Sequence, residues 1–159
     1  MADSSTSRIA DVALDETSIV RWNPDVDHER RVAIYDLLED NHFEPKSGIT
    51  GPFKLKLRME DTRLAMDIQS MEGKLLETIR VPLVPFLRII KEYFVVCESY
   101  NQAIKTASRA QIEAIDMGRR GLHNDGASLL RERLADKVAV DDNTARRLFT
   151  LICVLQIRG

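Results

Sequence analysis

Apolar and polar residues alternate strictly along residues 53–60 (FKLKLRME). Because successive side chains of a strand point to opposite faces, this pattern predicts a strand with one face in a core and the other in water. Residues 63–68 and 75–81 continue the alternation after turns at Asp61-Thr62 and Glu72-Gly73. A three-stranded antiparallel meander is therefore expected. The apolar residues expected to share its buried face are Phe53, Leu55, Leu57, Leu64, Met66 and Ile68.

Two further elements are predicted before the meander. Residues 9–14 alternate in the same way and suit a short strand. Asn23-Pro24-Asp25 is typical of a helix start, because Asn caps the helix and Pro fits its first turn. This helix is expected to run to about Asp40. Residues 41–52 hold two Gly and two Pro and are predicted to be a loop.

After Pro82 the apolar period changes from two to about 3.6, which indicates helix. A helix beginning at Pro85 and ending near Gly118 or Gly121 would be about 50 Å long. Such a helix is longer than a small core requires. Two alternatives follow: the helix is broken near Ser108, or part of its apolar stripe packs on a second subunit.

Two shorter helices are predicted near the end of the chain. Asn124-Asp125 can cap the first, and Asp141-Asp142 can cap the second. The second is apolar on almost every side, so it is expected to be buried on two sides or to lie in an interface. Its two stripes are Ala145, Leu148, Phe149, Ile152 and Cys153, and then Leu151, Val154 and Leu155.

These elements predict an α+β fold, with an N-terminal strand and helix, a three-stranded antiparallel meander, and a C-terminal helical half that contains one long helix. Residues 1–7 are expected to form a disordered tail and residues 8–159 a single domain. Within that domain, residues 8–81 form the strand, helix and meander part, and residues 82–159 form the helical part. The hydrophobic content of 44% and charged content of 30% are typical of a globular protein.

The charge balance excludes a strong overall field. With 23 Lys and Arg against 25 Asp and Glu, the net charge is -2, which does not steer the chain toward nucleic acid or an anionic membrane. The C-terminal half is slightly basic, since residues 83–159 hold 12 basic and 9 acidic side chains. No secretory signal and no membrane span are recognised, so a cytoplasmic protein is expected. Cys97 and Cys153 are expected to be buried, reduced thiols.

No arrangement of residues predicts a metal site, a cofactor or a catalytic group. The acidic clusters around His28 and His42 lie at opposite ends of one predicted helix, about 20 Å apart. His123, Asp125 and Ser128 have the residue types of a nucleophilic triad, but the G-x-S-x-G turn is absent from the sequence. These side chains are interpreted as solvated or capping residues.

The basic face of the first meander strand is interpreted as a wet sheet face. Lys54, Lys56 and Arg58 have no aromatic residues between them on which bases could stack. The order helix, three strands, helix resembles that of a double-stranded-RNA-binding domain. The basic cluster that grips phosphates at the start of the second helix of such domains is missing here, so only the element order matches.

The string RRGLHND, residues 119–125, has two interpretations. In the first it is a helix corner, in which two arginines suit a helix C-terminus and Gly121 suits a left-handed cap. In the second it is an anion or phosphate site, with Arg119, Arg120, His123 and Asn124 gathered at a helix N-terminus.

Three stretches resemble a known family: ADVALDETSIVRWNPDVDHERRVAIYDLLEDNHFEP, residues 10–45, IEAIDMGRRGLHNDGASLLRERL, residues 112–134, and DDNTARRLFTLICVLQ, residues 141–156. They are similar to Uncharacterised Protein Family 0262 of the alphaproteobacteria, and GRRGLHN is the most specific string. The resemblance implies a cytosolic bacterial protein of one domain, and it implies no activity.

The leading hypothesis is a non-enzymatic binding or regulatory module that acts as a homodimer through the final helix or the far end of the long one. The alternative is an RNA- or phosphate-ligand-binding protein that uses the basic C-terminal half. A third hypothesis, an enzyme, would need a pocket assembled from residues that are distant in the sequence.

Overall fold

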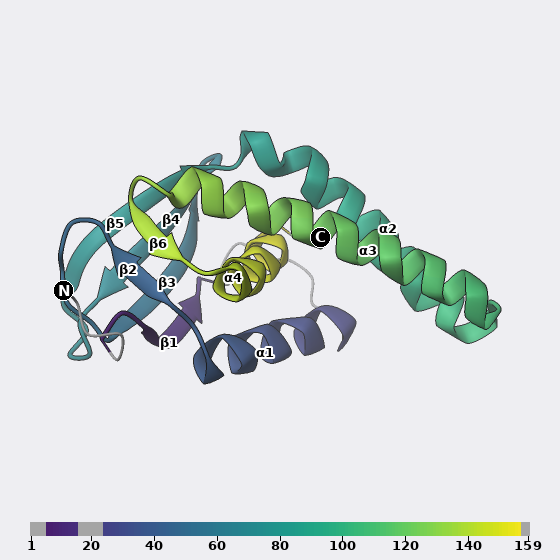
Figure 1. Cartoon of the computed structure of the whole chain (residues 1–159), viewed down its shortest axis with the longest axis horizontal. Coiled ribbons are helices and arrows are strands. Elements are labelled where there is room, and N and C mark those ends of the chain that lie inside the picture. Colours follow the sequence, from purple (N-terminus) through teal and green to yellow (C-terminus); the bar gives the residue numbers. More distant parts are fainter. Residues whose placement is uncertain (1–5, 16–23, 157–159) are drawn as a thin grey trace.

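The structure, a computed structural model, describes residues 6–15 and 24–156. It is an α+β fold of two sheets and four α-helices in the described part (Figure 1). The strands are β1 Ile9–Leu14, β2 Phe43–Pro45, β3 Phe53–Glu60, β4 Arg63–Gln69, β5 Leu75–Pro82 and β6 Val138–Val140. The helices are α1 Pro24–Glu39, the short 3₁₀ helix η2 Val84–Phe86, α2 Leu87–Thr106, α3 Arg109–Leu134 and α4 Asp142–Leu155.

The main sheet has the strand order β1-β3-β4-β5, in which β1 runs parallel to β3 and the other pairs are antiparallel. The meander predicted from the alternating pattern is confirmed, and so is the strand over residues 9–14. The buried face of the meander holds the six residues expected there, and each is at most 1% exposed: Phe53, Leu55, Leu57, Leu64, Met66 and Ile68. On the other face Lys56 is exposed, whereas Lys54 and Arg58 are half-buried.

The segment predicted to be only a loop, residues 41–52, contains strand β2. This strand pairs antiparallel with β6, and Phe43 lies opposite Val140. The loop prediction was therefore wrong for residues 43–45. Each strand has only three residues, which is too short for an alternating pattern to be recognised in the sequence. The pair ties the segment before the meander to the segment between α3 and α4.

The long helix predicted after Pro85 is broken, as the first alternative stated. α2 ends at Thr106, Ala107 has an extended backbone, and α3 begins at Arg109. Ser108 caps α3 with a capping box: its Oγ accepts from the Gln111 backbone N–H at 3.3 Å, and the Gln111 Oε1 accepts from the Ser108 N–H at 3.1 Å. α2 and α3 thus form a helical hairpin, which projects beyond the rest of the molecule as an arm (Figure 1).

The helix end predicted at Gly118 or Gly121 was wrong, and so was the new helix start at Asn124-Asp125. α3 is continuous from Arg109 to Leu134 and passes through all of these residues. Glycine weakens a helix by only about 1 kcal/mol per residue, which a long, partly packed helix tolerates. Because this stretch lies within a helix, the corner predicted for residues 119–125 does not exist.

α4 lies in the centre of the molecule, with α1 on one side, α3 on another and the main sheet beyond its end (Figure 1). Asp141 caps it as predicted, accepting a hydrogen bond from the Thr144 N–H at 2.8 Å. Both apolar stripes of α4 are buried within the chain, including Leu151 and Leu155. The final helix therefore cannot supply the apolar interface that its second stripe suggested, because intramolecular packing covers both stripes.

Two predictions fall near the edges of the described residues. The helix cap at Asn23 lies outside them, and so do residues 1–5 of the predicted tail. Of the rest of that tail, Ser7 is 5% exposed and its carbonyl accepts from the Phe43 N–H at 2.8 Å. The packed part of the chain therefore begins before Arg8.

Candidate functional site

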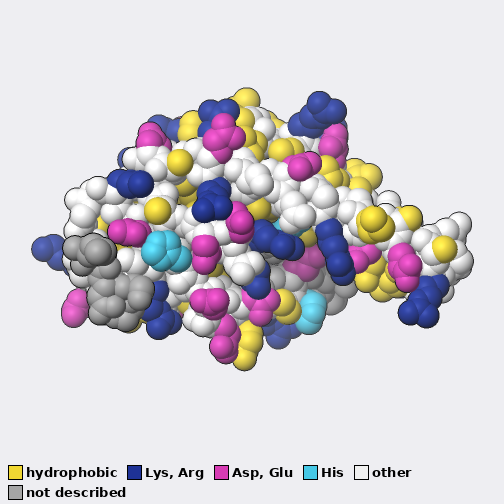
Figure 2. Space-filling model, in the orientation of Figure 1, with side chains coloured by type: hydrophobic (Ala, Val, Ile, Leu, Met, Phe, Trp, Pro, Cys, Tyr) yellow, Lys and Arg dark blue, Asp and Glu magenta, His cyan; other side chains and the backbone are white. Residues whose placement is uncertain are grey.

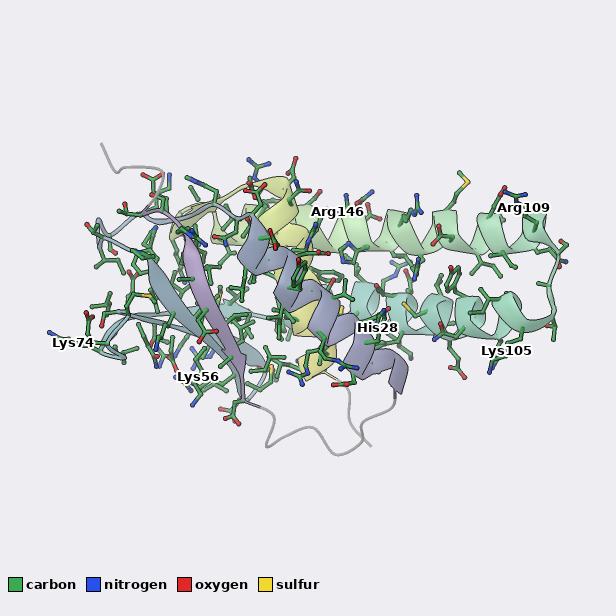
Figure 3. All side chains as sticks on the ribbon, turned by 90° about the horizontal axis from the view of Figure 1, so that it is seen from below. His28, Lys56, Lys74, Lys105, Arg109 and Arg146 are labelled. Atoms are coloured by element: carbon green, nitrogen blue, oxygen red, sulfur yellow. The ribbon has the colours of Figure 1, made fainter. Side chains whose placement is uncertain are left out.

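A pocket of about 640 Å³ lies between α1, α2 and α4. Its size falls within the range of about 300–1,000 Å³ that is typical of small-molecule sites. The lining residues are Val26 and Glu29 of α1, Tyr93, Phe94, Cys97, Glu98, Asn101, Gln102 and Lys105 of α2, and Thr150, Cys153 and Val154 of α4 with Gln156 after it. Figure 3 shows Lys105 near the projecting end of α2 and His28 on the neighbouring α1.

The sequence does not reveal this pocket, because the residues that line it come from segments that are far apart in the chain. Cys97 and Cys153 are 56 positions apart but line the same pocket. Each lies in the apolar stripe of its own helix. The feature of the sequence that relates to the pocket is the apolar character of α4 on two sides, which indicates that other helices pack around it.

The aromatic residues that line the pocket are Tyr93 and Phe94 of α2. Behind this lining the Tyr93 ring stacks on the Phe149 ring with centroids 6.1 Å apart. His123 meets both rings edge-on, with centroid distances of 5.6 Å to Tyr93 and 5.5 Å to Phe149. Tyr93 is therefore held in place by rings of α3 and α4 that do not themselves line the pocket.

Neither thiol of the pocket is activated. Burial, with the nearby Glu29 carboxylate, raises the pKa of Cys97 to about 11. Complete burial, followed by the charge of Cys97, raises the pKa of Cys153 well above the ordinary thiol value. Burial also raises the pKa of Tyr93, so all three groups are neutral near pH 7. Both cysteines are free thiols, as predicted, but the prediction that both are buried holds only for Cys153, since Cys97 is half-buried. The raised pKa values leave little thiolate, the nucleophilic form, at neutral pH.

His123 and Thr150 have the residue types of a base and a nucleophile, and Thr150 lines the pocket. Their Nε2 and Oγ1 atoms are 2.7 Å apart. The Thr150 hydroxyl donates its one hydrogen to the Arg146 carbonyl at 3.2 Å. We therefore assign the hydrogen between His123 and Thr150 to His123 Nε2, which donates it to the Thr150 oxygen. Because Nε2 then already carries a hydrogen, it cannot accept the proton of the Thr150 hydroxyl.

His123 is also neutral near pH 7. Burial, together with the charges of Arg146, Arg147 and Arg119, lowers the pKa of His123 to about 4. A base this weak captures a proton poorly at neutral pH. The pair is therefore a structural hydrogen bond that joins α3 to α4.

The structure separates the four residues of the predicted anion site into two pairs. Arg119 and His123, one turn apart, face the interior, whereas Arg120 and Asn124, also one turn apart, are exposed. Arg119 lies 4.2 Å over the Tyr100 ring and pairs with Asp116, and Arg120 pairs with the same carboxylate at 2.9 Å. No helix N-terminus is present at this point, because α3 is continuous.

Arg58 on the basic face of β3, and the neighbouring arginines of β4 and β5, are paired with acids of the same sheet. Asp67 on β4 holds Arg58 at 2.8 Å, and Glu60 contacts Arg63 at 2.8 Å and Arg80 at 2.9 Å. The hydrogen bond from Arg58 holds the pKa of Asp67 below its ordinary value. The arginines of this surface form a network of ion pairs with the acids of the sheet. Their positive charges are therefore already paired and do not form a binding surface for a phosphate backbone.

The described residues contain neither a metal-binding cluster nor a helix suited to cross a membrane. No group of three or more His, Cys, Asp or Glu side chains within residues 6–15 and 24–156 is arranged to hold a metal ion. In the same part of the chain, every helix is too short or too polar to cross a membrane.

Comparison with known proteins identifies the family. The sequence profile of an uncharacterised protein family, UPF0262, matches residues 6–158. A UPF0262 protein of Rhodospirillum rubrum is 58% identical over 154 residues, which cover 97% of this chain and 95% of that protein. A UPF0262 protein of Sphingopyxis alaskensis is 55% identical over 162 residues, covering 99% and 98%. No solved structure matches the chain. The resemblance seen in the sequence is confirmed: this chain belongs to the UPF0262 family.

Proposed function

We propose that this bacterial protein is a non-enzymatic binding protein of the cytoplasm, and that its ligand occupies the pocket between α1, α2 and α4. The observation that carries the proposal is the pocket itself, which combines an aromatic and thiol wall with a polar rim. Tyr93, Cys97 and Cys153 are neutral at pH 7, and the Thr150 hydroxyl already has a partner. Such groups favour binding over covalent chemistry.

The charges of the rim favour a neutral or positively charged ligand. Glu29 and Glu98 line the pocket from α1 and α2, and Lys105 is the one cation among the described residues of its lining. The Glu29 carboxylate acts on the inner wall, because its charge contributes to raising the pKa of Tyr93 and of Cys97. The proposed ligand therefore has an apolar body against the aromatic wall and a hydrogen-bonding or cationic end at the rim.

The experiment is a fluorescence titration with two dyes of similar shape and different charge. Neutral phenylnaphthylamine is expected to bind saturably, and anionic anilinonaphthalene sulfonate is expected to bind more weakly. Cys97→Phe places a ring in the pocket and should weaken binding of the neutral dye by at least about tenfold, or 1.4 kcal/mol. Leu75→Phe, on the exposed surface of β5, is the matched control and should leave binding unchanged.

A second variant tests the charge of the rim. Glu29→Gln keeps the shape of the side chain and removes its charge, so the difference between the two dyes should become smaller. The proposal is overturned if the neutral dye does not bind, or if Cys97→Phe and Leu75→Phe affect binding equally. Preference for the anionic dye would refute the ligand chemistry and leave the location of the site supported.

A further inference from the structure

The outward face of α3 on the projecting arm has no covering within the described residues. Met117 lies at its centre and is 74% exposed. Ala110, Ala114 and Gly121 flank it at helical spacing, and all are exposed. Figure 2 shows hydrophobic side chains gathered along the arm, with charged side chains of both signs around them.

Two glycines on this arm are not explained by packing within the chain. A Cβ atom added to Gly118 or Gly121 would meet nothing within 4 Å. Glycine inside a helix is less favourable than alanine by about 1 kcal/mol. Gly121 lies on the Met117 face, where a second packed helix would approach its backbone closely, whereas Gly118 is about 100° around the helix from Met117 and lies outside that face.

Glu113 and Arg120 carry opposite charges beside this face, and each also has a partner on its own helix: Arg109 lies 3.5 Å from Glu113, and Asp116 lies 2.9 Å from Arg120. Glu113 and Arg120 are seven residues apart, so they lie on one side of α3 about 10 Å apart along the axis. In an antiparallel pair of α3 helices related by a two-fold axis at Met117, Glu113 of each copy lies opposite Arg120 of the other. Ala114 and Gly121 are also seven residues apart, and the midpoint of this pair lies one residue further along α3 than the midpoint of Glu113 and Arg120, with Met117 between the two midpoints. An axis at Met117 therefore brings each pair to within one residue, about 1.5 Å along the helix, of direct opposition, as an isologous interface requires.

We propose that the occupant of this face is a second copy of the chain, and that two copies pack α3 against α3 in antiparallel orientation, with Met117 at the two-fold axis. The interface uses the outward face of the arm between Arg109 and Asp125, and the pocket stays open. A single pair of crossing helices buries less than the standard of about 800 Å² per partner. The dimer is therefore expected to dissociate on dilution.

The first test is sedimentation velocity from the low-micromolar to the high-micromolar range. The apparent mass should rise from 18.1 kDa toward about twice that value as concentration increases. Met117→Lys places two ammonium groups together at the axis and should abolish the rise. Val95→Lys makes the same change on α2, where Val95 is 58% exposed, and should leave association unchanged.

A charge exchange then tests the register. Glu113→Arg and Arg120→Glu each create two like-charge pairs across the dimer, and each should weaken association about tenfold. The double variant Glu113→Arg/Arg120→Glu restores opposite charges and should restore association. Glu113 and Arg120 are too far apart to pair with each other within one helix, where their partners are Arg109 and Asp116. A monomer at every concentration, or a dimer indifferent to Met117→Lys, overturns the proposal.

Discussion

Gly126 of α3 lies directly against the Phe149 ring of α4, and the substitution Gly126→Ala tests how tightly the two helices pack there. A Cβ atom at this position would lie 2.2 Å from Cζ of Phe149 and 2.4 Å from its Cε1. The Phe149 ring is fully buried and is held by its contacts with Tyr93 and His123. The ring has no free space into which it can move without displacing these neighbours.

The magnitude follows from two opposing effects. Forcing one extra carbon into a packed core is destabilising, by about 3 kcal/mol at the upper end of the usual range, and a rigid ring at this distance belongs there. Replacing a helical glycine by alanine contributes about 1 kcal/mol in the other direction. We expect Gly126→Ala to lower the free energy of unfolding by about 2 kcal/mol.

Gly118→Ala is the matched control, since it is the same change on the same helix. A Cβ atom at Gly118 meets nothing within 4 Å, so only the helix preference remains and stability should rise by about 0.5–1 kcal/mol. Urea unfolding followed by far-ultraviolet circular dichroism measures both variants. If Gly126→Ala is as stable as the wild type, the Phe149 ring is free to move and the packing argument is wrong.

Three further predictions concern the core, the acid response and the thiols. Leu57→Ala should destabilise the fold by about 2–5 kcal/mol in the same assay, whereas Lys56→Ala on the opposite face should change it by less than about 0.5 kcal/mol; a small effect at Leu57 would contradict the strand register. Because the folded state holds the pKa of His123 at about 4 against 6.5 for the free side chain, the unfolded state binds the proton first as the pH falls. Roughly 3 kcal/mol of stability should be lost between those two values, and His123→Gln should flatten that part of the profile; an equal loss in both proteins would assign the acid response elsewhere. Since the pKa of Cys97 is about 11, its alkylation by iodoacetamide should speed up about tenfold per pH unit above pH 7, while fully buried Cys153 should react only on unfolding; a rate at Cys97 that does not change between pH 7 and 9 would show an activated thiolate.

The local pattern of the sequence determines the elements that depend on near neighbours. The strands of the meander follow from strict alternation, because a one-residue shift would move every apolar side chain to the wrong face. The start of α4 follows from the Asp141 cap. The break after α2 was one of two alternatives that the sequence left open, and the Ser108–Gln111 capping box in the structure accounts for it. Each of these signals lies within a few residues of the structure that it predicts.

The tertiary structure decided the features that depend on distant segments. α3 continues through Gly118 and Gly121, although both residues suggested an end to the helix. The pairing of β2 with β6 joins segments nearly a hundred residues apart along the chain, and neither strand has a pattern of its own. Whether α4 is apolar for an interface or for a core depends on what surrounds it, and α1, α3 and the sheet surround it here. The pocket arises in the same way, because Cys97 and Cys153 meet only when α2 and α4 pack together. The sequence indicates which side chains avoid water, but the partner against which each side chain packs depends on the fold of the whole chain.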